Sequence, residues 1–134
     1  MAKKGTTKYY SNLQEEHVAK VLGGKKVPAS GGDKFVAGDL VIPHTMIIEC
    51  KTTTKEDKKS WTIKKDWLIQ NEKERMDLML PYSALAISLD QTGTNNLYVI
   101  DEKLMKKLVD FLADEWYSKR IIRNKEEIKW LSTK

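Results

Sequence analysis

Two short apolar runs in the first half of the chain end in charged residues whose types could bind a metal ion. Asp39 precedes one run, and Glu49 and Lys51 close the next. Alternate residues of a strand share a face, so Glu49 and Lys51 should project together while Ile48 and Cys50 point to the other side. Burying such charges at strand ends is costly unless a partner compensates, and a divalent cation would do so.

The turn between the two runs predicts which residues face each other. Pro43-His44-Thr45 is typical of a turn, because proline cannot take part in a central ladder. A hairpin symmetric about His44 places Asp39 directly opposite Glu49, with Cβ atoms about 4.5–5.5 Å apart. Two carboxylates at that distance repel each other unless a cation lies between them. A slip of one residue would move Asp39 to the other face.

An acid two residues before a lysine is not specific by itself. The same spacing recurs, in polar surroundings typical of solvated charge, at Glu56, Asp57, Asp101 and Glu127. Glu49 differs because apolar and β-branched residues surround it, which predicts a strand.

Magnesium prefers about six oxygen ligands and usually keeps several waters. Asp39, Glu49 and the backbone carbonyl of Cys50, together with a phosphate oxygen and waters, would complete such a shell. The metal would polarise a phosphodiester and activate water. Lys51 could position that water or stabilise the charge that develops in the transition state.

A third carboxylate could come from the first predicted helix. Glu15 lies three residues before Val18 and four before Ala19, which puts it on the inward face of that helix. Glu16 projects with Lys20 toward solvent. We therefore favour Glu15 as the third acid, with Glu16 as the alternative and a solvated helix carboxylate as the simpler interpretation of either.

The periodicity of the remaining segments predicts an α/β fold. Predicted helices cover residues 11–22, 66–81 and 101–117, and predicted strands cover residues 40–42, 46–51, 61–63, 84–89 and 96–100. Ser11 and Asp66 are the expected helix caps, and Gly23 ends the first helix. This order predicts a mixed sheet of about five strands flanked by helices on both sides.

At 134 residues the chain is expected to form a single domain, residues 1–134. Residues 1–10 are expected to form a basic arm, and residues 118–134 a basic C-terminal tail that could hold a further short helix.

The net charge of +5 favours an anionic partner. Cys50 is the only cysteine, which excludes an intramolecular disulfide and suits a reducing compartment. We interpret its side chain as core filler rather than as a nucleophile. The chain contains no apolar run of about 18 residues and no signal-peptide pattern. We therefore expect a cytoplasmic protein with no membrane partner.

Several polar side chains could contact DNA phosphates in a salt-sensitive way. Ser30, in a glycine-flanked loop, could donate a hydrogen bond to a phosphate or simply belong to a turn. Either Lys64 or Lys65 faces the site, or both meet backbone phosphates or water. Trp61 and Trp67 are interpreted as core or interface residues. The candidate DNA-binding residues are Ser30, Lys55, Lys58, Lys59, Lys64 and Lys65.

Together these residues resemble the PD-(D/E)xK nuclease superfamily, and within it the archaeal-type Holliday junction resolvases and their phage relatives. The likeness covers about residues 11–90. It rests on the segments Gln14–Gly24, Pro28–Gly31, Gly38–Asp39, Ile48–Thr52 and Ser60–Lys65. The resemblance implies a restriction-endonuclease-like sheet.

The resemblance also implies roles for individual residues and an activity. It matches Glu15, Ser30, Asp39, Glu49 and Lys51 to the helix Glu, loop Ser, metal-binding Asp, Glu and Lys of these enzymes. It implies a homodimer acting in DNA recombination and repair, in a bacterial, archaeal or phage-infected host cell. Such an enzyme makes paired nicks in four-way DNA junctions, uses Mg²⁺ or Mn²⁺ and leaves 5′-phosphates.

The chain departs from the family pattern in two places. Gly38 replaces the proline that often precedes the Asp. The segment between the first helix and Pro28 is short, with no room for the strand that the resolvases have there.

Two alternatives to a junction resolvase remain. One is a PD-(D/E)xK nuclease of other specificity, of the repair or restriction type. The other is a DNA-binding module whose nuclease site has decayed, against which the intact Asp39, Glu49 and Lys51 argue.

Overall fold

The computed structural model describes residues 2–26 and 39–132, and the side chains within these ranges except those of Asp39 and of residues 120–132. The fold is α/β with a five-stranded mixed sheet, as the sequence predicts. The chain divides into two compact units, Met1–Ile100 and Asp101–Lys134. The sheet belongs to the first unit.

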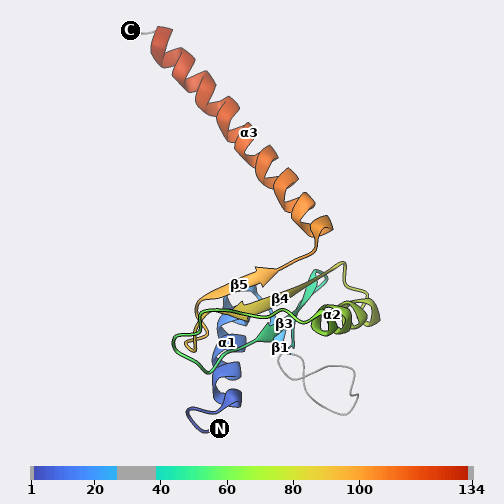
Figure 1. Cartoon of the computed structure of the whole chain (residues 1–134). Coiled ribbons are helices and arrows are strands. Elements are labelled where there is room, and N and C mark those ends of the chain that lie inside the picture. Colours follow the sequence, from blue (N-terminus) through green and yellow to red (C-terminus); the bar gives the residue numbers. More distant parts are fainter. Residues whose placement is uncertain (1, 27–38, 133–134) are drawn as a thin grey trace. The chain divides into compact units, whose positions relative to one another are not determined.

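The strands lie in the sheet in the order in which they occur in the chain (Figure 1). They are β1 (Lys25–Lys26), β2 (Asp39–Ile42), β3 (Met46–Lys51), β4 (Tyr82–Ser88) and β5 (Asn96–Val99). β3 and β4 pair in parallel, while the other neighbours are antiparallel. The parallel pair follows from the helix α2 (Lys65–Asp77) between these strands, because only a long crossover returns the chain in the same direction.

The β2–β3 hairpin has the register that the sequence predicts. Asp39 pairs with Glu49, and Ile42 pairs with Met46. His44, at the centre of the turn, has a positive φ of 59°. The turn is closed by the Thr45 backbone N–H, which donates to the Ile42 carbonyl at 3.0 Å. The prediction that the two acids lie on directly opposed backbone positions is therefore confirmed.

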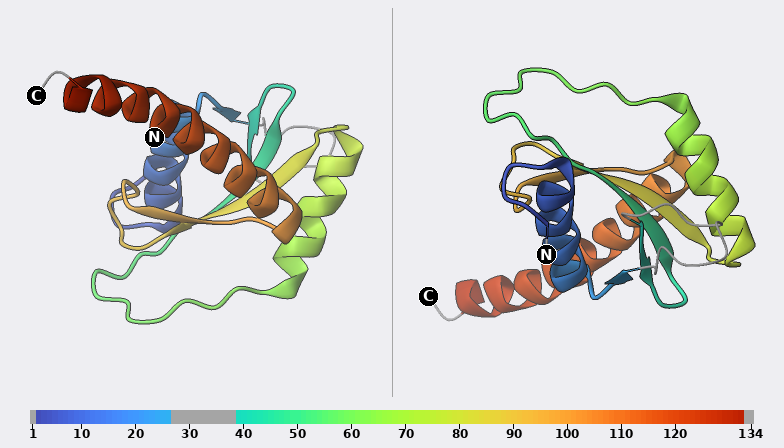
Figure 2. Two further views of the ribbon diagram at one scale, coloured as in Figure 1. Left: turned by 90° about the horizontal axis from the view of Figure 1, so that it is seen from above. Right: turned by 90° about the horizontal axis from the view of Figure 1, so that it is seen from below.

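The two faces of the sheet have different partners. On one face, apolar side chains pack in a buried cluster with Val18 of α1 (Thr7–Leu22). Figure 2 shows α1 behind the strands in one view and in front of them in the opposite view, so α1 covers a single face. The sheet residues of this cluster are Leu40, Ile48, Ala84 and Ala86.

The other face of the sheet meets α2. The Ser83 hydroxyl on β4 donates to the Glu72 carboxylate at 2.7 Å, and the Lys51 ammonium on β3 lies over the Trp67 ring. Ser83 and Lys51 have odd numbers, whereas the core cluster uses even positions. The alternation of a strand thus sends Glu49 and Lys51 to the α2 side and Ile48 and Cys50 to the α1 side.

Helix α1 begins earlier than the sequence predicts. Its cap is Thr6, not Ser11, because the Thr6 hydroxyl accepts a hydrogen bond from the Tyr9 N–H at 3.2 Å. The helix therefore starts inside residues 1–10, for which the sequence predicts a basic arm. Its end agrees with the prediction, since Gly23 adopts the left-handed conformation with a φ of 76°.

The segment after α1 does contain a strand, so the prediction of no room for one is wrong. Lys26 of β1 pairs with Leu40 of β2. Gly23 turns the chain immediately after the helix, and only two residues are needed to form this short ladder.

The predicted strand at Trp61–Ile63 is absent from the described part of the chain, where residues 52–64 form a connection without a ladder. The Trp61 indole N–H donates to the Ser88 carbonyl at 2.9 Å, so the side chain is bonded to β4 instead. Helix α2 begins one residue before Asp66, with Lys64 at the cap position, and ends at Asp77 rather than near Pro81.

The second unit consists mainly of α3 (Glu102–Ser132). The Asp101 carboxylate caps it by accepting from the Leu104 N–H at 2.8 Å. The helix continues past residue 118 and ends at Ser132. The sequence instead predicts a separate tail that begins at residue 118. Among the described residues, none of the helices has the length and apolar character needed to cross a membrane.

Candidate active site

Glu49 and Lys51 form a close ion pair at the end of β3. The Lys51 Nζ lies 2.8 Å from the Glu49 Oε1. Glu49 is only 6% exposed, and Lys51 is partly buried beside it. The prediction that the two side chains share one face of the strand is confirmed.

The second carboxylate oxygen of Glu49 has an unusual environment. The Glu49 Oε2 is buried and accepts no hydrogen bond from the residues that the structure describes. A buried carboxylate oxygen without a hydrogen-bond donor is unfavourable, which makes the Glu49 Oε2 a candidate ligand atom for a cation. A carboxylate oxygen is the ligand type that Mg²⁺ prefers.

Asp39 is the residue opposite this carboxylate in the hairpin. Its backbone pairs with that of Glu49, but its side chain lies outside the described residues. Within the part of the chain whose side chains are described, no three His, Cys, Asp or Glu residues form a group that could hold a metal ion. The Asp39 carboxylate lies outside that part of the chain. The donors that Asp39, Glu49 and the Cys50 carbonyl offer are all oxygens, which fit a hard divalent cation.

The side chain of Cys50 behaves as the sequence predicts. It projects to the α1 face and packs against the buried cluster of that face. Its thiol is thus on the opposite side of the strand from Glu49 and Lys51, which leaves only its backbone carbonyl as a candidate ligand.

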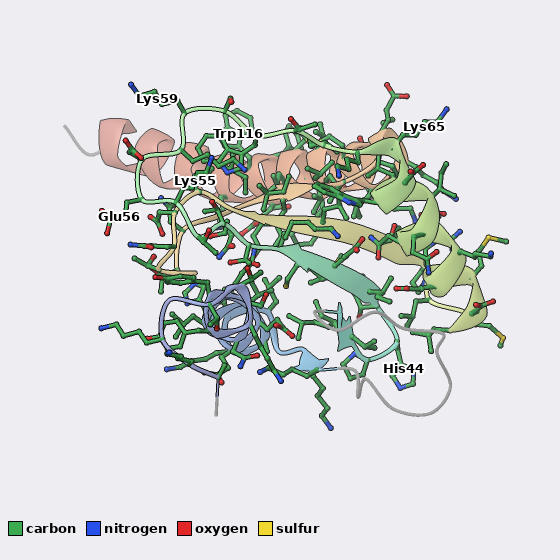
Figure 3. The ribbon with its side chains drawn as sticks, turned by 60° about the horizontal axis from the view of Figure 1, so that its bottom comes forward. His44, Lys55, Glu56, Lys59, Lys65 and Trp116 are labelled. Atoms are coloured by element: carbon green, nitrogen blue, oxygen red, sulfur yellow. The ribbon has the colours of Figure 1, made fainter. Side chains whose placement is uncertain are left out.

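Two ammonium groups converge on the Trp67 ring. The Lys51 Nζ lies 4.4 Å from the ring centroid, and the Lys64 Nζ lies 5.7 Å from it. Lys65, at the start of α2, points away from the sheet (Figure 3). Of the two lysines that the sequence leaves open, Lys64 is therefore the one beside Lys51. Trp67 is half-buried between the helix and the site, which agrees with an interior role for its ring.

Glu15 faces inward on α1, and Glu16 faces solvent, as predicted. Glu15 is 7% exposed, and burial raises the pKa of its carboxyl, with Lys26 lowering it and Glu16 raising it further. Glu16 is exposed and lies 3.8 Å from the Lys26 ammonium. Glu15 belongs to the layer on the α1 face, whereas Glu49 projects from the α2 face. A site that uses both the Glu15 and Glu49 carboxylates would therefore have to form around the end of β3 rather than on one face of the sheet.

One buried residue that the sequence analysis did not select connects α1 to this end of the sheet. The Gln14 Nε2 lies 3.1 Å from the Lys51 carbonyl oxygen and 3.0 Å from that of Ala86. It also donates to the Asn96 Oδ1 at 2.9 Å. The sequence does indicate that Gln14 faces inward, because Gln14 and Val18 are four residues apart and share one face of the helix.

The basic segment between β3 and α2 has two attachments to the β4–β5 region. The Gln91 amide donates to the Glu56 carboxylate at 2.9 Å, and Trp61 is bonded to Ser88 as described. Figure 3 shows Lys55 and Lys59 along this segment, with Lys59 pointing outward. The segment that carries these lysines is thus held at two points by its own side chains. Ser30 lies outside the described residues.

Comparison of the chain with protein-family models, with curated proteins and with solved structures finds no match in any of the three.

Proposed function

We propose that the protein is a divalent-metal-dependent DNA endonuclease that acts on branched DNA, most specifically on four-way junctions. The observation that carries the proposal is the state of Glu49. One of its oxygens is paired with Lys51, the other is buried without a described partner, and its backbone lies opposite Asp39. An acid pair that can hold a cation, beside an ammonium that can stabilise developing charge, suits metal-dependent phosphodiester hydrolysis.

The residues of the site divide into ligands and a charge-stabilising group. Asp39, Glu49 and the Cys50 carbonyl would hold Mg²⁺ or Mn²⁺, with Glu15 as a further acid near the end of β3. The cation would supply Lewis-acid activation of the phosphodiester and of water. Lys51, which is paired with Glu49 in this structure, would turn its ammonium to a phosphate oxygen and stabilise the negative charge that increases during attack.

The basic residues around the site fit a nucleic-acid partner. Lys64 adds a second ammonium beside Lys51 at the Trp67 ring. The segment with Lys55, Lys58 and Lys59 follows β3 directly. It would therefore contact the DNA strand on either side of the scissile phosphate. Such contacts bind phosphates without reading sequence, which suits an enzyme that selects DNA by its shape.

Paired nicks in a four-way junction require two active centres. The active form would therefore be a homodimer, in which each chain cuts one strand. Selection of a branched substrate rests on the resemblance in sequence, and hydrolysis rests on the geometry of Glu49 and Lys51. The two parts of the proposal can be tested separately.

The test uses labelled four-way junction, linear duplex and single-stranded DNA, each incubated with the protein in Mg²⁺, in Mn²⁺ and in EDTA. We expect cleavage of the junction only, in both metals, and none in EDTA. Cleavage of all three DNAs would instead indicate a nuclease of other specificity. Tight junction binding without cleavage in either metal would indicate a DNA-binding module with a decayed site.

A further inference from the structure

We propose that Gln14 is a positioning residue, which fixes the backbone of Lys51 against α1 and so sets the placement of Lys51 relative to Glu15. The effect on catalysis rests on the proposed function, while the structural effect does not. Gln14 is fully buried, with 0% of its surface exposed. It lies directly before Glu15 in the chain and donates to the carbonyl of Lys51 itself.

The donor that Gln14 provides cannot be replaced by a carboxylate. Its Nε2 carries two hydrogens and lies within 3.1 Å of three acceptors, the Lys51 and Ala86 carbonyls and the Asn96 side-chain oxygen. At least one hydrogen is therefore shared. A glutamate would place a negative oxygen among these acceptors, so the position needs an amide.

The β4–β5 turn holds Gln14 from the other side. A Cβ added to Gly93 would lie 2.6 Å from the Gln14 backbone nitrogen and 2.8 Å from its Cα, so the two backbones are in close contact. The Asn96 Nδ2 donates to the Gly93 carbonyl at 2.9 Å, while its Oδ1 accepts from Gln14. The Gln14 side chain is thus enclosed between the β4–β5 turn, the end of β3 and Ala86 of β4.

Loss of the Gln14 bond would affect the end of β3. Lys51 is the last residue of the strand, and the chain continues into the segment that carries Lys55. Without a bond to its carbonyl, the end of β3 could move relative to α1, and the Lys51 ammonium would move with it. Displacement of a catalytic group by about 1 Å can cost about 10²-fold in rate.

Asn71 provides a matched control. It is also a buried amide, 2% exposed, and it lies on α2, on the other face of the sheet. Its Nδ2 donates to the Ala84 carbonyl at 2.9 Å. Both side chains have an amide oxygen that accepts no hydrogen bond from the described residues. Gln14→Leu and Asn71→Leu therefore both remove a buried amide bonded to a strand carbonyl, but only the first removes a bond to Lys51.

The experiment compares the wild type, Gln14→Leu, Asn71→Leu and Asn96→Ala under conditions where circular dichroism shows each folded. Amide hydrogen exchange at Cys50 and Lys51, the last two residues of β3 that pair with β4, and the kcat and KM of junction cleavage are measured for each. We expect Gln14→Leu to lose protection at both amides and about 10²-fold in kcat, with KM unchanged. Asn71→Leu should keep both close to wild type, and Asn96→Ala should lie between them.

The outcomes separate this inference from the proposed function. Equal losses of protection in Gln14→Leu and Asn71→Leu, or no loss in either, would overturn the role of Gln14. An unchanged kcat in Gln14→Leu would overturn its effect on catalysis. A wild type that cuts no DNA would refute the proposed function, and the exchange data would still decide whether Gln14 fixes the end of β3. Asn96→Ala serves the same comparison if Gln14→Leu does not fold.

Discussion

The Lys51 ammonium lies 2.8 Å from one oxygen of Glu49, while the other oxygen of the same carboxylate is buried without a described hydrogen-bond partner. Only one of the two Glu49 carboxylate oxygens therefore has a described partner. A buried ion pair is favourable only when its remaining lone pairs are also satisfied, so the arrangement favours a further positive group at Glu49.

Asp39→Asn and Glu49→Gln should each reduce junction cleavage by about 10²-fold or more, because each removes an anionic ligand of the cation. Junction affinity should stay the same or increase, since the loss of a carboxylate reduces the repulsion of phosphate. Cleavage rates and gel-shift affinities measure the two effects. Asp57→Asn, in the basic segment, is the control and should keep full activity. Full activity in Glu49→Gln would place the metal elsewhere.

Trp67→Leu should slow cleavage because the Lys51 ammonium loses the ring that holds it. A cation–π contact of this kind contributes about 1 kcal/mol, which corresponds to about fivefold in rate. Trp67→Phe keeps a ring face and should retain most of the activity. Trp61→Phe, which removes the indole bond to Ser88 and keeps a ring face for the Lys58 ammonium, should affect stability rather than kcat. Steady-state kinetics on the three variants test this, and equal kcat in Trp67→Leu and the wild type would contradict it.

Glu15→Gln should stabilise the protein at neutral pH. Burial raises the pKa of Glu15 above its ordinary value of 4.5, so the folded state binds its proton more tightly than the unfolded chain does. The stability from this proton is present below pH 4.5 and is lost as the pH rises through the folded-state pKa.

Urea unfolding from pH 4 to pH 8 measures this effect. The advantage of Glu15→Gln over the wild type should be greatest at neutral pH and should shrink as the pH falls. Glu16→Gln, on the exposed side of the same helix, is the control and should show little pH-dependent gain. A pH-independent difference for Glu15→Gln would show that the carboxyl is not the cause.

Gly93→Ala should destabilise the protein more than Gly23→Ala. Both glycines have a φ of 76°, so an alanine is strained by a similar amount at each. A Cβ at Gly23 meets no atom of the described residues within 4 Å, whereas one at Gly93 would meet the Gln14 backbone at 2.6 Å. The difference should be about 1–3 kcal/mol, as is typical of overpacking. Thermal and urea unfolding of the two variants measure it, and equal losses would mean that the β4–β5 turn is not packed tightly on α1.

The hairpin could be predicted in detail because two independent features of the sequence agree there. The alternation of apolar residues sets which side chains share a face, and Pro43 sets the position of the turn. Only one register satisfies both, and it is the one that pairs Asp39 with Glu49. The inward orientation of Glu15 was predictable for the same reason, since helical spacing from Val18 determines it.

Other elements carried no comparable signal. β1 consists of two lysines, whose type gives no indication of a strand, and it forms because Gly23 directs the chain along β2. Trp61 and Ile63 favour a strand by propensity, but the Trp61 indole bonds to the end of β4 and no partner strand lies beside the segment in the described structure. Helical spacing from Val18 indicates that Gln14 faces inward, but its contacts with three strands depend on tertiary packing, which no local pattern encodes.

Titration of Mn²⁺ into the metal-free protein, followed by calorimetry, tests the central claim most directly. The wild type should show a saturable site, and Asp39→Asn and Glu49→Gln should each lose it, while Asp57→Asn should bind as the wild type does. Saturable binding that is unchanged in both Asp39→Asn and Glu49→Gln, or no binding by the wild type, would contradict the account.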